Sequence, residues 1–181
     1  DVVTTELVPG MTLEALNPQR RLNELEFLFP AHALDFSALR ALLVSHGYPD
    51  VALEAGALRG FVKGFIDMIV EHDGRYWIVD WKSNHLGDMP EDYGAASLDG
   101  AMAEHAYHLQ ALLYTVALHR YLRTRVRDYA YDTHIGGYLY LFVRGVRPQW
   151  RHDGGAAGVH VRTPSAQLVF ALDALMDGGV A

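Results

Sequence analysis

Residues 64–82, with the sequence GFIDMIVEHDGRYWIVDWK, decide how this chain is expected to fold. Two apolar runs, rich in β-branched and aromatic side chains, flank the dipeptide Asp73-Gly74. Asp-Gly fits a two-residue type I′ turn well, because both central residues of that turn need a positive φ. The stretch therefore predicts a β-hairpin. Strands that are apolar on both faces are usually central, so we expect this hairpin in the interior of a sheet.

Acidic side chains interrupt these apolar strands at matching positions. With the two-residue turn, the strand pairing places Asp67 directly opposite Asp80. Directly opposed Cβ atoms are about 4.5–5.5 Å apart, and two like charges at that separation destabilise a sheet. Lys82 shares a face with Asp80, because side chains alternate along a strand. The pattern therefore indicates a metal cation between the two carboxylates, with a lysine beside it.

Two other interpretations of the hairpin stay open. A three-residue loop with a bulge shifts the pairing by one residue and moves one acid to the opposite face. Alternatively, the hairpin lies at the edge of the sheet and its polar residues align by chance. The combination of Asp67, Asp80 and Lys82 favours the metal site, because unpaired charge is costly within a central strand.

The composition is typical of a globular protein. The chain has 181 residues, of which 50% are hydrophobic, and its formal net charge is −7. This length suits one domain with a core, and the acidic balance argues against a generic DNA-coating protein. The sequence contains no cysteine, which excludes disulfides and thiolate metal sites and is compatible with a cytoplasmic location. No apolar run approaches the roughly 18–20 residues of a membrane span.

The order of predicted elements indicates an α/β domain with a small mixed central sheet flanked by helices. Hydrophobic spacing and breakers such as glycine and proline give the boundaries. Strands are expected over residues 22–30, 60–71, 76–83 and 138–143, with loops over 84–94 and 148–158. Helices are expected over residues 36–45, 101–122 and 164–176. Thr163 is the expected N-cap of the last helix, with Pro164 at its first position.

Some polar residues outside the hairpin are candidates for a site. On the long predicted helix, Tyr107, Gln110 and Tyr114 share one face and are placed to bind a phosphate or a substrate strand. The alternative is that these tyrosines pack with their hydroxyl groups at the surface. Glu24, on the first predicted strand, is a possible further cation ligand. His105 and His108 have helical spacing, but no carboxylate stands where a zinc site needs one, so zinc is not expected there.

Longer segments resemble a known family. An acid, a hairpin turn and Asp-x-Lys form the signature of the PD-(D/E)xK nucleases, although Ile66 replaces the proline of that name. Four segments resemble the C-terminal nuclease domains of the RecB family, the beta subunits of exodeoxyribonuclease V. They are Leu58–Asp67, Val79–Asn84, His108–Leu122 and Tyr138–Val146. The resemblance implies a restriction-endonuclease-like core over residues 21–181. Residues 1–20 are expected to be an irregular lead-in from an upstream region of a longer chain.

The resemblance also implies a role for individual residues. Asp67 and Asp80 are expected to bind Mg²⁺ together with the backbone carbonyl of Trp81. Lys82 is expected to position or activate the attacking water. Gln110 and Tyr114 match a motif that contacts the strand being cut, and Glu24 matches an acid that precedes the hairpin in related nucleases. The family's metal-binding histidine lies in an upstream helix and has no match in residues 1–20, so we expect it outside this sequence.

The implied activity is Mg²⁺-dependent exonuclease and endonuclease cleavage of DNA within a RecBCD-type helicase–nuclease. Such an enzyme acts in double-strand break repair and recombination. The implied partners are single strands from unwound duplex ends, RecC-like and RecD-like subunits, and the helicase region of the same polypeptide. Two alternatives remain, namely a degenerate nuclease fold that serves as a protein or DNA docking module, and a standalone PD-(D/E)xK repair nuclease.

Overall fold

The predicted hairpin is present in the computed structural model, which describes residues 1–54, 56–152 and 154–178. It joins β2 (Ala57–His72) to β3 (Arg75–Lys82). Asp73 has a φ of 50° and Gly74 a φ of 76°, as a type I′ turn requires. The strands pair in the predicted register, from His72 opposite Arg75 to Met68 opposite Val79. The alternative with a shifted register is therefore wrong.

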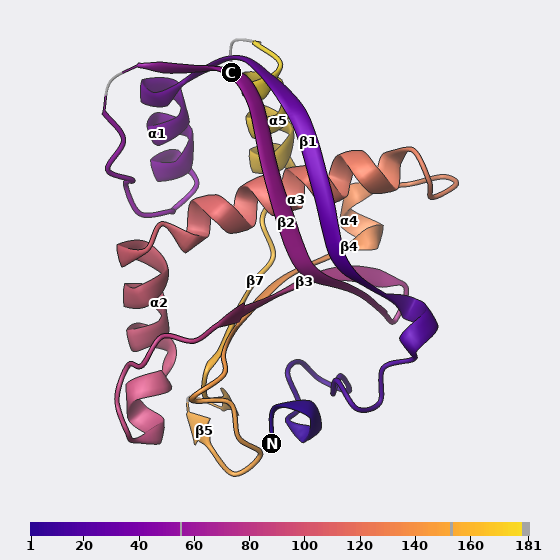
Figure 1. The fold of residues 1–181 in the computed structure, drawn as a ribbon, viewed down its shortest axis with the longest axis vertical. Helices are drawn as coiled ribbons and strands as arrows, with labels where there is room; N and C mark the ends of the chain where they lie inside the picture. Colours follow the sequence, from indigo (N-terminus) through magenta and orange to yellow (C-terminus); the bar gives the residue numbers. More distant parts are fainter. Residues whose placement is uncertain (55, 153, 179–181) are drawn as a thin grey trace.

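The hairpin occupies the interior of a five-stranded sheet with the order β1-β2-β3-β4-β7. The outer partners are β1 (Arg21–Asp35), β4 (Ile135–Phe142) and β7 (Val159–Arg162). β3 and β4 are parallel, whereas the other neighbouring pairs are antiparallel, so the sheet is mixed. Figure 1 shows β1 and β2 as two long, curved strands that continue past α3 (Tyr107–Arg123). The interpretation of the hairpin as an edge is wrong, because β1 and β4 cover its two sides.

Side-chain caps determine where two of the remaining helices begin. α1 (Phe36–Ser45) has the predicted bounds, and the Asp35 carboxylate caps it by accepting from Ala38 N at 2.7 Å. α5 (Ala166–Met176) begins later than predicted, because Ser165 is its N-cap and the Thr163 hydroxyl donates to the Gly136 carbonyl instead. The remaining elements are α4 (Tyr131–His134), β5 (Arg151–His152), β6 (Gly155–Ala156) and three 3₁₀ turns, Val2–Thr4, Pro18–Arg20 and Pro90–Tyr93. Across the described residues, the helices all fall short of the length and apolarity that crossing a membrane requires.

The predicted helix over residues 101–122 is two helices. α2 (Ala95–Glu104) ends at His105, and α3 begins after Ala106, which has a φ of 53°. A left-handed alanine is strained, and neither glycine nor proline marks the position, so this turn has no local signal in the sequence. The break lets α3 take a direction different from that of α2 and cross the sheet (Figure 1).

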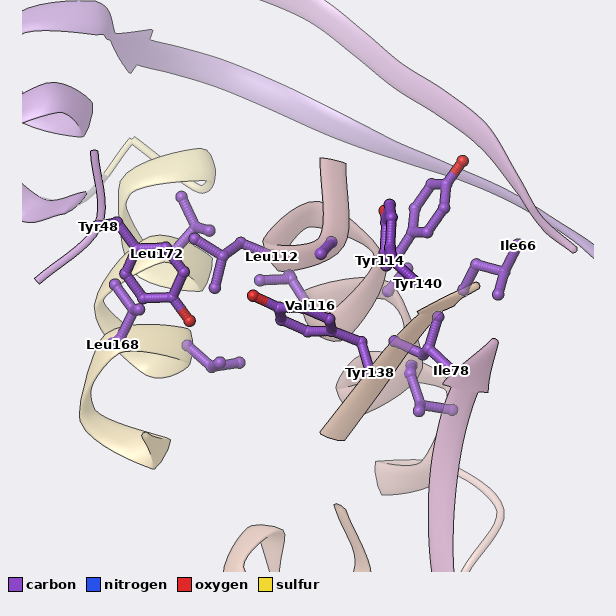
Figure 2. Close-up of a cluster of buried hydrophobic side chains, with 14 of the residues drawn as sticks. Tyr48, Ile66, Ile78, Leu112, Tyr114, Val116, Tyr138, Tyr140, Leu168 and Leu172 are labelled. Carbon is purple, nitrogen blue, oxygen red and sulfur yellow. The ribbon is translucent and has the colours of Figure 1, made fainter. Parts of the chain in front are cut away.

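The sheet has a hydrophobic core on each of its two faces. On one face, strand residues such as Ile66, Ile78 and Tyr138 pack with Leu112 of α3 and Leu172 of α5 (Figure 2). On the other face, the first residues of the chain form the cover, with Leu7, Met11 and Leu13 buried against Met68, Val70 and Val79. Each such side chain contributes about 1.5–3 kcal/mol when it is fully buried. The irregular lead-in over residues 1–20 therefore packs on the second face of the sheet.

Candidate active site

Acidic residues from three adjacent strands lie near one another at the end of the hairpin farthest from its turn. The ladder between β1 and β2 pairs Asn23 with Met68 and Leu25 with Ile66, which brackets Glu24 and Asp67 as neighbours. Asp80 follows on β3, where its side chain is buried and only 3% of the residue is exposed. Glu24 is exposed and has a φ of 54°, which interrupts the regular strand at this point.

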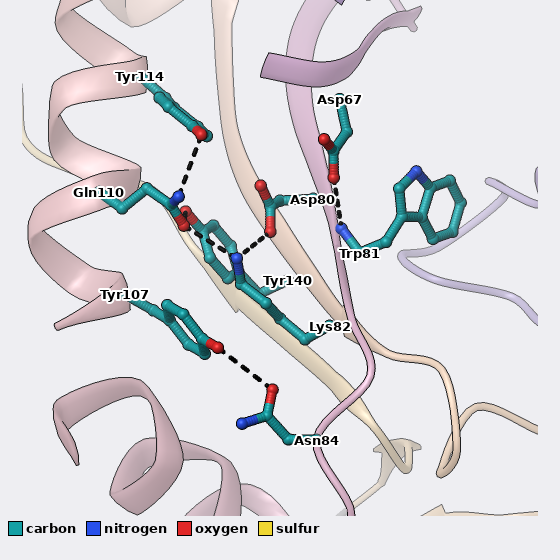
Figure 3. A network of polar contacts seen from close by, with 9 residues as sticks. All are labelled: Asp67, Asp80, Trp81, Lys82, Asn84, Tyr107, Gln110, Tyr114 and Tyr140. Carbon is teal, nitrogen blue, oxygen red and sulfur yellow. Dashed lines mark hydrogen bonds and ion pairs between the residues drawn. The ribbon is translucent and has the colours of Figure 1, made fainter. Parts of the chain in front are cut away.

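The predicted direct pairing of Asp67 with Asp80 needs a correction. The β2–β3 ladder ends one pair earlier, at Met68 and Val79. Beyond it, the Asp67 carboxylate accepts a hydrogen bond from the Trp81 backbone N–H at 3.0 Å (Figure 3). This bond takes the place of a ladder bond and fixes the Asp67 carboxylate against the Trp81 backbone, the predicted source of a carbonyl ligand.

Asp80 and Lys82 form a buried ion pair. Lys82 Nζ lies 2.5 Å from Asp80 Oδ2, and the side chains are 11% and 4% exposed. Burial raises the pKa of Asp80, the Lys82 charge opposes that rise, and the neighbouring Asp67 adds to it. The contact is an ion pair rather than a well-directed hydrogen bond, so among the described residues Asp80 Oδ2 has no hydrogen-bond donor. This carboxylate oxygen therefore already faces a cation, the Lys82 ammonium.

The Lys82 ammonium is surrounded by groups that hold it in place. It donates to Gln110 Oε1 at 2.9 Å, and it lies 4.0 Å from the centre of the Tyr107 ring and 4.9 Å from that of Tyr140. Such cation–π contacts are worth about 0.5–2 kcal/mol, more when water is excluded. A lysine at this position is thus restrained by three residues, two from α3 and one from β4.

Gln110 connects the helix to the strands. Its Oε1 accepts from Lys82 and from the Tyr140 hydroxyl at 3.0 Å, and its Nε2 donates to the Tyr114 hydroxyl at 3.1 Å (Figure 3). Burial, with the nearby Asp80 and Asp67 charges, raises the pKa of Tyr114 to about 12, so this hydroxyl keeps its proton at neutral pH. The shared face predicted for Tyr107, Gln110 and Tyr114 is confirmed.

Tyr140 was not predicted as part of this group. It pairs with Asp80 across the parallel strands β3 and β4, and it is fully buried. Its apolar surroundings in the sequence are typical of a core residue. A parallel pairing between distant segments is not visible in either segment alone, so the sequence offered no local signal for it.

Two of the acids, Glu24 and Asp67, line an open pocket that fits a hard divalent cation. The pocket has a volume of about 350 Å³ and is lined by Asn23, Glu24, Asp67, Met68 and Trp81. Mg²⁺ prefers oxygen ligands and usually keeps several waters, so a few carboxylates beside an open space suit it. A divalent cation beside a fixed lysine is an arrangement suited to phosphate chemistry, because both neutralise charge on a phosphate group.

The sequence pattern of the PD-(D/E)XK nuclease superfamily matches residues 9–175, and the chain belongs to this superfamily. The mixed sheet with its flanking helices is consistent with the α/β core of these nucleases. Together with the relatives described next, this match supports a deoxyribonuclease, and nucleases of this superfamily use a divalent metal.

Several similar proteins carry the name RecBCD enzyme subunit RecB. The chain is 39% identical over 175 residues to that of Escherichia coli (strain K12), covering 93% of this chain and 14% of the relative. It is 42% identical over 194 residues to that of Mycobacterium tuberculosis (strain ATCC 25618 / H37Rv), covering 94% and 18%. The Haemophilus influenzae protein is 35% identical over 166 residues, covering 91% and 13%. The chain therefore spans less than a fifth of the length of these relatives.

Proposed function

We propose that this chain is a Mg²⁺-dependent DNA nuclease domain that hydrolyses phosphodiester bonds. The observation that carries the proposal is the placement of Asp67, Asp80 and Lys82 on one hairpin, with the lysine held by Gln110. Asp67 and Asp80, with the Trp81 carbonyl, are the proposed metal ligands, and Glu24 is a further acid that lines a pocket together with Asp67 and Trp81. When bound, magnesium supplies charge neutralisation and a more acidic water.

The remaining residues either act on the substrate or hold another side chain of the site in place. Lys82 orients the attacking water and offsets negative charge that develops on the phosphate. Gln110 and Tyr140 keep its ammonium group in one position, so that little reorganisation is needed during the reaction. Tyr114, protonated and bonded to Gln110, can donate to a phosphate oxygen of the strand being cut. The hydrogen bond that Asp67 accepts from the Trp81 backbone keeps the Asp67 carboxylate aligned with that of Asp80.

The proposed context is a RecBCD-type helicase–nuclease in the cytoplasm. Its support is the identity to RecB subunits over more than nine-tenths of this chain. The domain would act as exonuclease and endonuclease on single strands from unwound duplex ends, in double-strand break repair and recombination. The helicase region of the same polypeptide and RecC-like and RecD-like subunits are the proposed protein partners.

A cleavage assay with single-stranded DNA and Mg²⁺ tests the proposal. We expect Asp80→Ala to abolish Mg²⁺-dependent cleavage and to leave the circular dichroism spectrum unchanged. Asp128→Asn is the matched control, because Asp128 is exposed and its φ of 55° is one that asparagine tolerates. Cleavage retained in Asp80→Ala contradicts the assignment. If the unsubstituted chain cleaves no DNA with Mg²⁺ or with any other divalent cation, the alternative of a docking module is favoured.

A further inference from the structure

Three side chains from separate elements form a second group of metal-binding atoms, which includes none of the proposed catalytic residues. They are Asp99 of α2, His108 of α3 and His160 of β7. Each offers one nitrogen or oxygen atom, and these atoms all lie within 4.8 Å of one another. The two histidines are buried, with 4% and 8% of the residue exposed, whereas Asp99 is exposed.

His160 has one imidazole nitrogen in use and one free. Its Nε2 lies 2.9 Å from Asp99 Oδ1. An ionised carboxylate only accepts hydrogen bonds, so without metal Nε2 carries the proton, and a cation bound between Nε2 and Asp99 would displace that proton. Among the described residues, Nδ1 is buried without a hydrogen-bond partner. The two ring nitrogens of an imidazole point in different directions, so Nε2, the nitrogen that faces Asp99, is the one that His160 offers to an ion bound there.

His108 presents a second neutral imidazole to the same place. The ring centres of His108 and His160 are 5.4 Å apart, and His108 Nδ1 lies 3.4 Å from the Tyr138 hydroxyl. Burial lowers the pKa of both histidines, that of His108 to about 4, and a neutral imidazole is the form that binds metal. The nearby cation, Arg162, stacks on Tyr48 and donates to the Gly47 carbonyl.

We propose that Asp99, His108 and His160 bind a Zn²⁺-class divalent cation. Two imidazoles and one carboxylate are a ligand set of zinc proteins, and water supplies the fourth position. Zinc bonds of about 2.0–2.1 Å place tetrahedral ligand atoms roughly 3.3 Å apart, so small movements of the exposed Asp99 and the two rings complete the site. The ion joins α2 and β7 to α3, the helix that carries Gln110. Its role is to fix that helix, and it stands independently of the proposed catalytic metal.

Cobalt and zinc titrations of the tag-free, chelator-treated chain test this site, with Mg²⁺ in excess to occupy oxygen sites. We expect one equivalent of Co²⁺ to produce the visible absorption of a tetrahedral ion. Zn²⁺ at about 100 times its Kd should raise the unfolding midpoint by roughly 5–10 °C. Both signals should be lost in His160→Gln and kept in Asp80→Asn and in His32→Ala, which removes an exposed histidine.

Asp99→Asn provides a second variant, because Asp99 is exposed and its replacement leaves the core intact. We expect its affinity for Co²⁺ to fall at least tenfold while its unfolding midpoint without metal stays within a few degrees of that of the unsubstituted chain. The proposal is overturned if the unsubstituted chain shows no tetrahedral absorption. It is also overturned if Asp99→Asn or a folded His160→Gln binds Co²⁺ with unchanged affinity.

Discussion

Lys82 Nζ lies 2.5 Å from Asp80 Oδ2, and these two residues are separated by a single tryptophan on β3. The alternation of the strand puts both side chains on the face that α3 covers, where the ion pair is excluded from water. Breaking a buried pair by removing one partner is costly, because the other charge is left uncompensated. Removing either charge is therefore expected to lower the free energy of unfolding, in addition to its effect on the proposed chemistry.

Lys82→Met separates the two roles proposed for this end of the hairpin. We expect cleavage to fall about 100- to 1,000-fold, because the cation that stabilises the transition state is lost. Mg²⁺ affinity should stay the same or rise, since a positive charge beside Asp80 has been removed. Cleavage kinetics and calorimetry measure the two effects. Lys63→Met is the control, because Lys63 is exposed and pairs with Glu26; equal losses in both variants contradict the role of Lys82.

Gln110→Ala removes the acceptor shared by Lys82 and Tyr140. Leaving these donors without a partner costs about 1–3 kcal/mol, and we expect the free energy of unfolding to fall by that amount. Cleavage should fall by at least tenfold, because the Lys82 ammonium is no longer held. Tyr140→Phe, which leaves the Lys82–Gln110 bond in place, should stay within a few-fold of the unsubstituted rate. Slower cleavage by Tyr140→Phe than by Gln110→Ala would contradict a positioning role for Gln110.

A pair of glycine substitutions tests the packing of β4 on β7. Gly137 has a φ of 134°, and an added Cβ would lie 2.5 Å from the Arg162 carbonyl oxygen, a backbone atom that cannot move alone. Gly137→Ala should lower the free energy of unfolding by about 2–4 kcal/mol. Gly100, within α2, has open space around it, so Gly100→Ala should raise stability by about 0.5–1 kcal/mol. Urea denaturation measures both, and equal effects from the two substitutions contradict this packing.

His119 links stability to pH. Burial lowers its pKa below 6.5, the charges of Arg123 and Arg120 add to that shift, and Asp173 opposes it. Its Nδ1 lies 2.9 Å from the Tyr129 hydroxyl. Between the folded pKa and 6.5 the unfolded chain binds more protons, so this contribution is fully present above pH 6.5 and is lost as the pH falls below it.

His119→Gln should therefore reduce the slope of unfolding free energy against pH between pH 5 and 6.5. The reduction is at most about 1.4 kcal/mol per pH unit, the value for one proton. Urea denaturation at several pH values measures the slope for both chains. An unchanged slope would show that His119 titrates normally in the folded chain.

Patterns among neighbouring residues in the sequence predicted the turns and helices that depend on those neighbours. The Asp73-Gly74 turn set the register of the hairpin, and α1 has the bounds expected from its spacing. The break at Ala106 was missed, because tertiary packing imposes a left-handed conformation that alanine does not favour. β7 was missed because its four residues, VHVR, are too short an apolar–polar alternation to predict a strand without the pairing with β4.

The residues of the two sites also fall into those that spacing groups together and those that only long-range contacts bring together. Asp67, Asp80 and Lys82 share a hairpin, and Gln110 and Tyr114 share a helix face, so spacing alone grouped each set. Tyr140 and the Asp99–His108–His160 group depend on pairings between segments far apart in the chain. The cover of the second sheet face by Leu7, Met11 and Leu13 is also a long-range contact. Such contacts leave no periodic pattern in either segment.

Calorimetric titration of Mg²⁺ shows whether Asp67 and Asp80 bind the metal. The chelator-treated chain is compared with Asp80→Asn, Asp67→Asn and the control Asp128→Asn. We predict saturable binding to the unsubstituted chain and the control, and at least tenfold weaker binding to the two hairpin variants. Equal Mg²⁺ affinity in Asp80→Asn and in the unsubstituted chain would show that Asp80 is not a metal ligand.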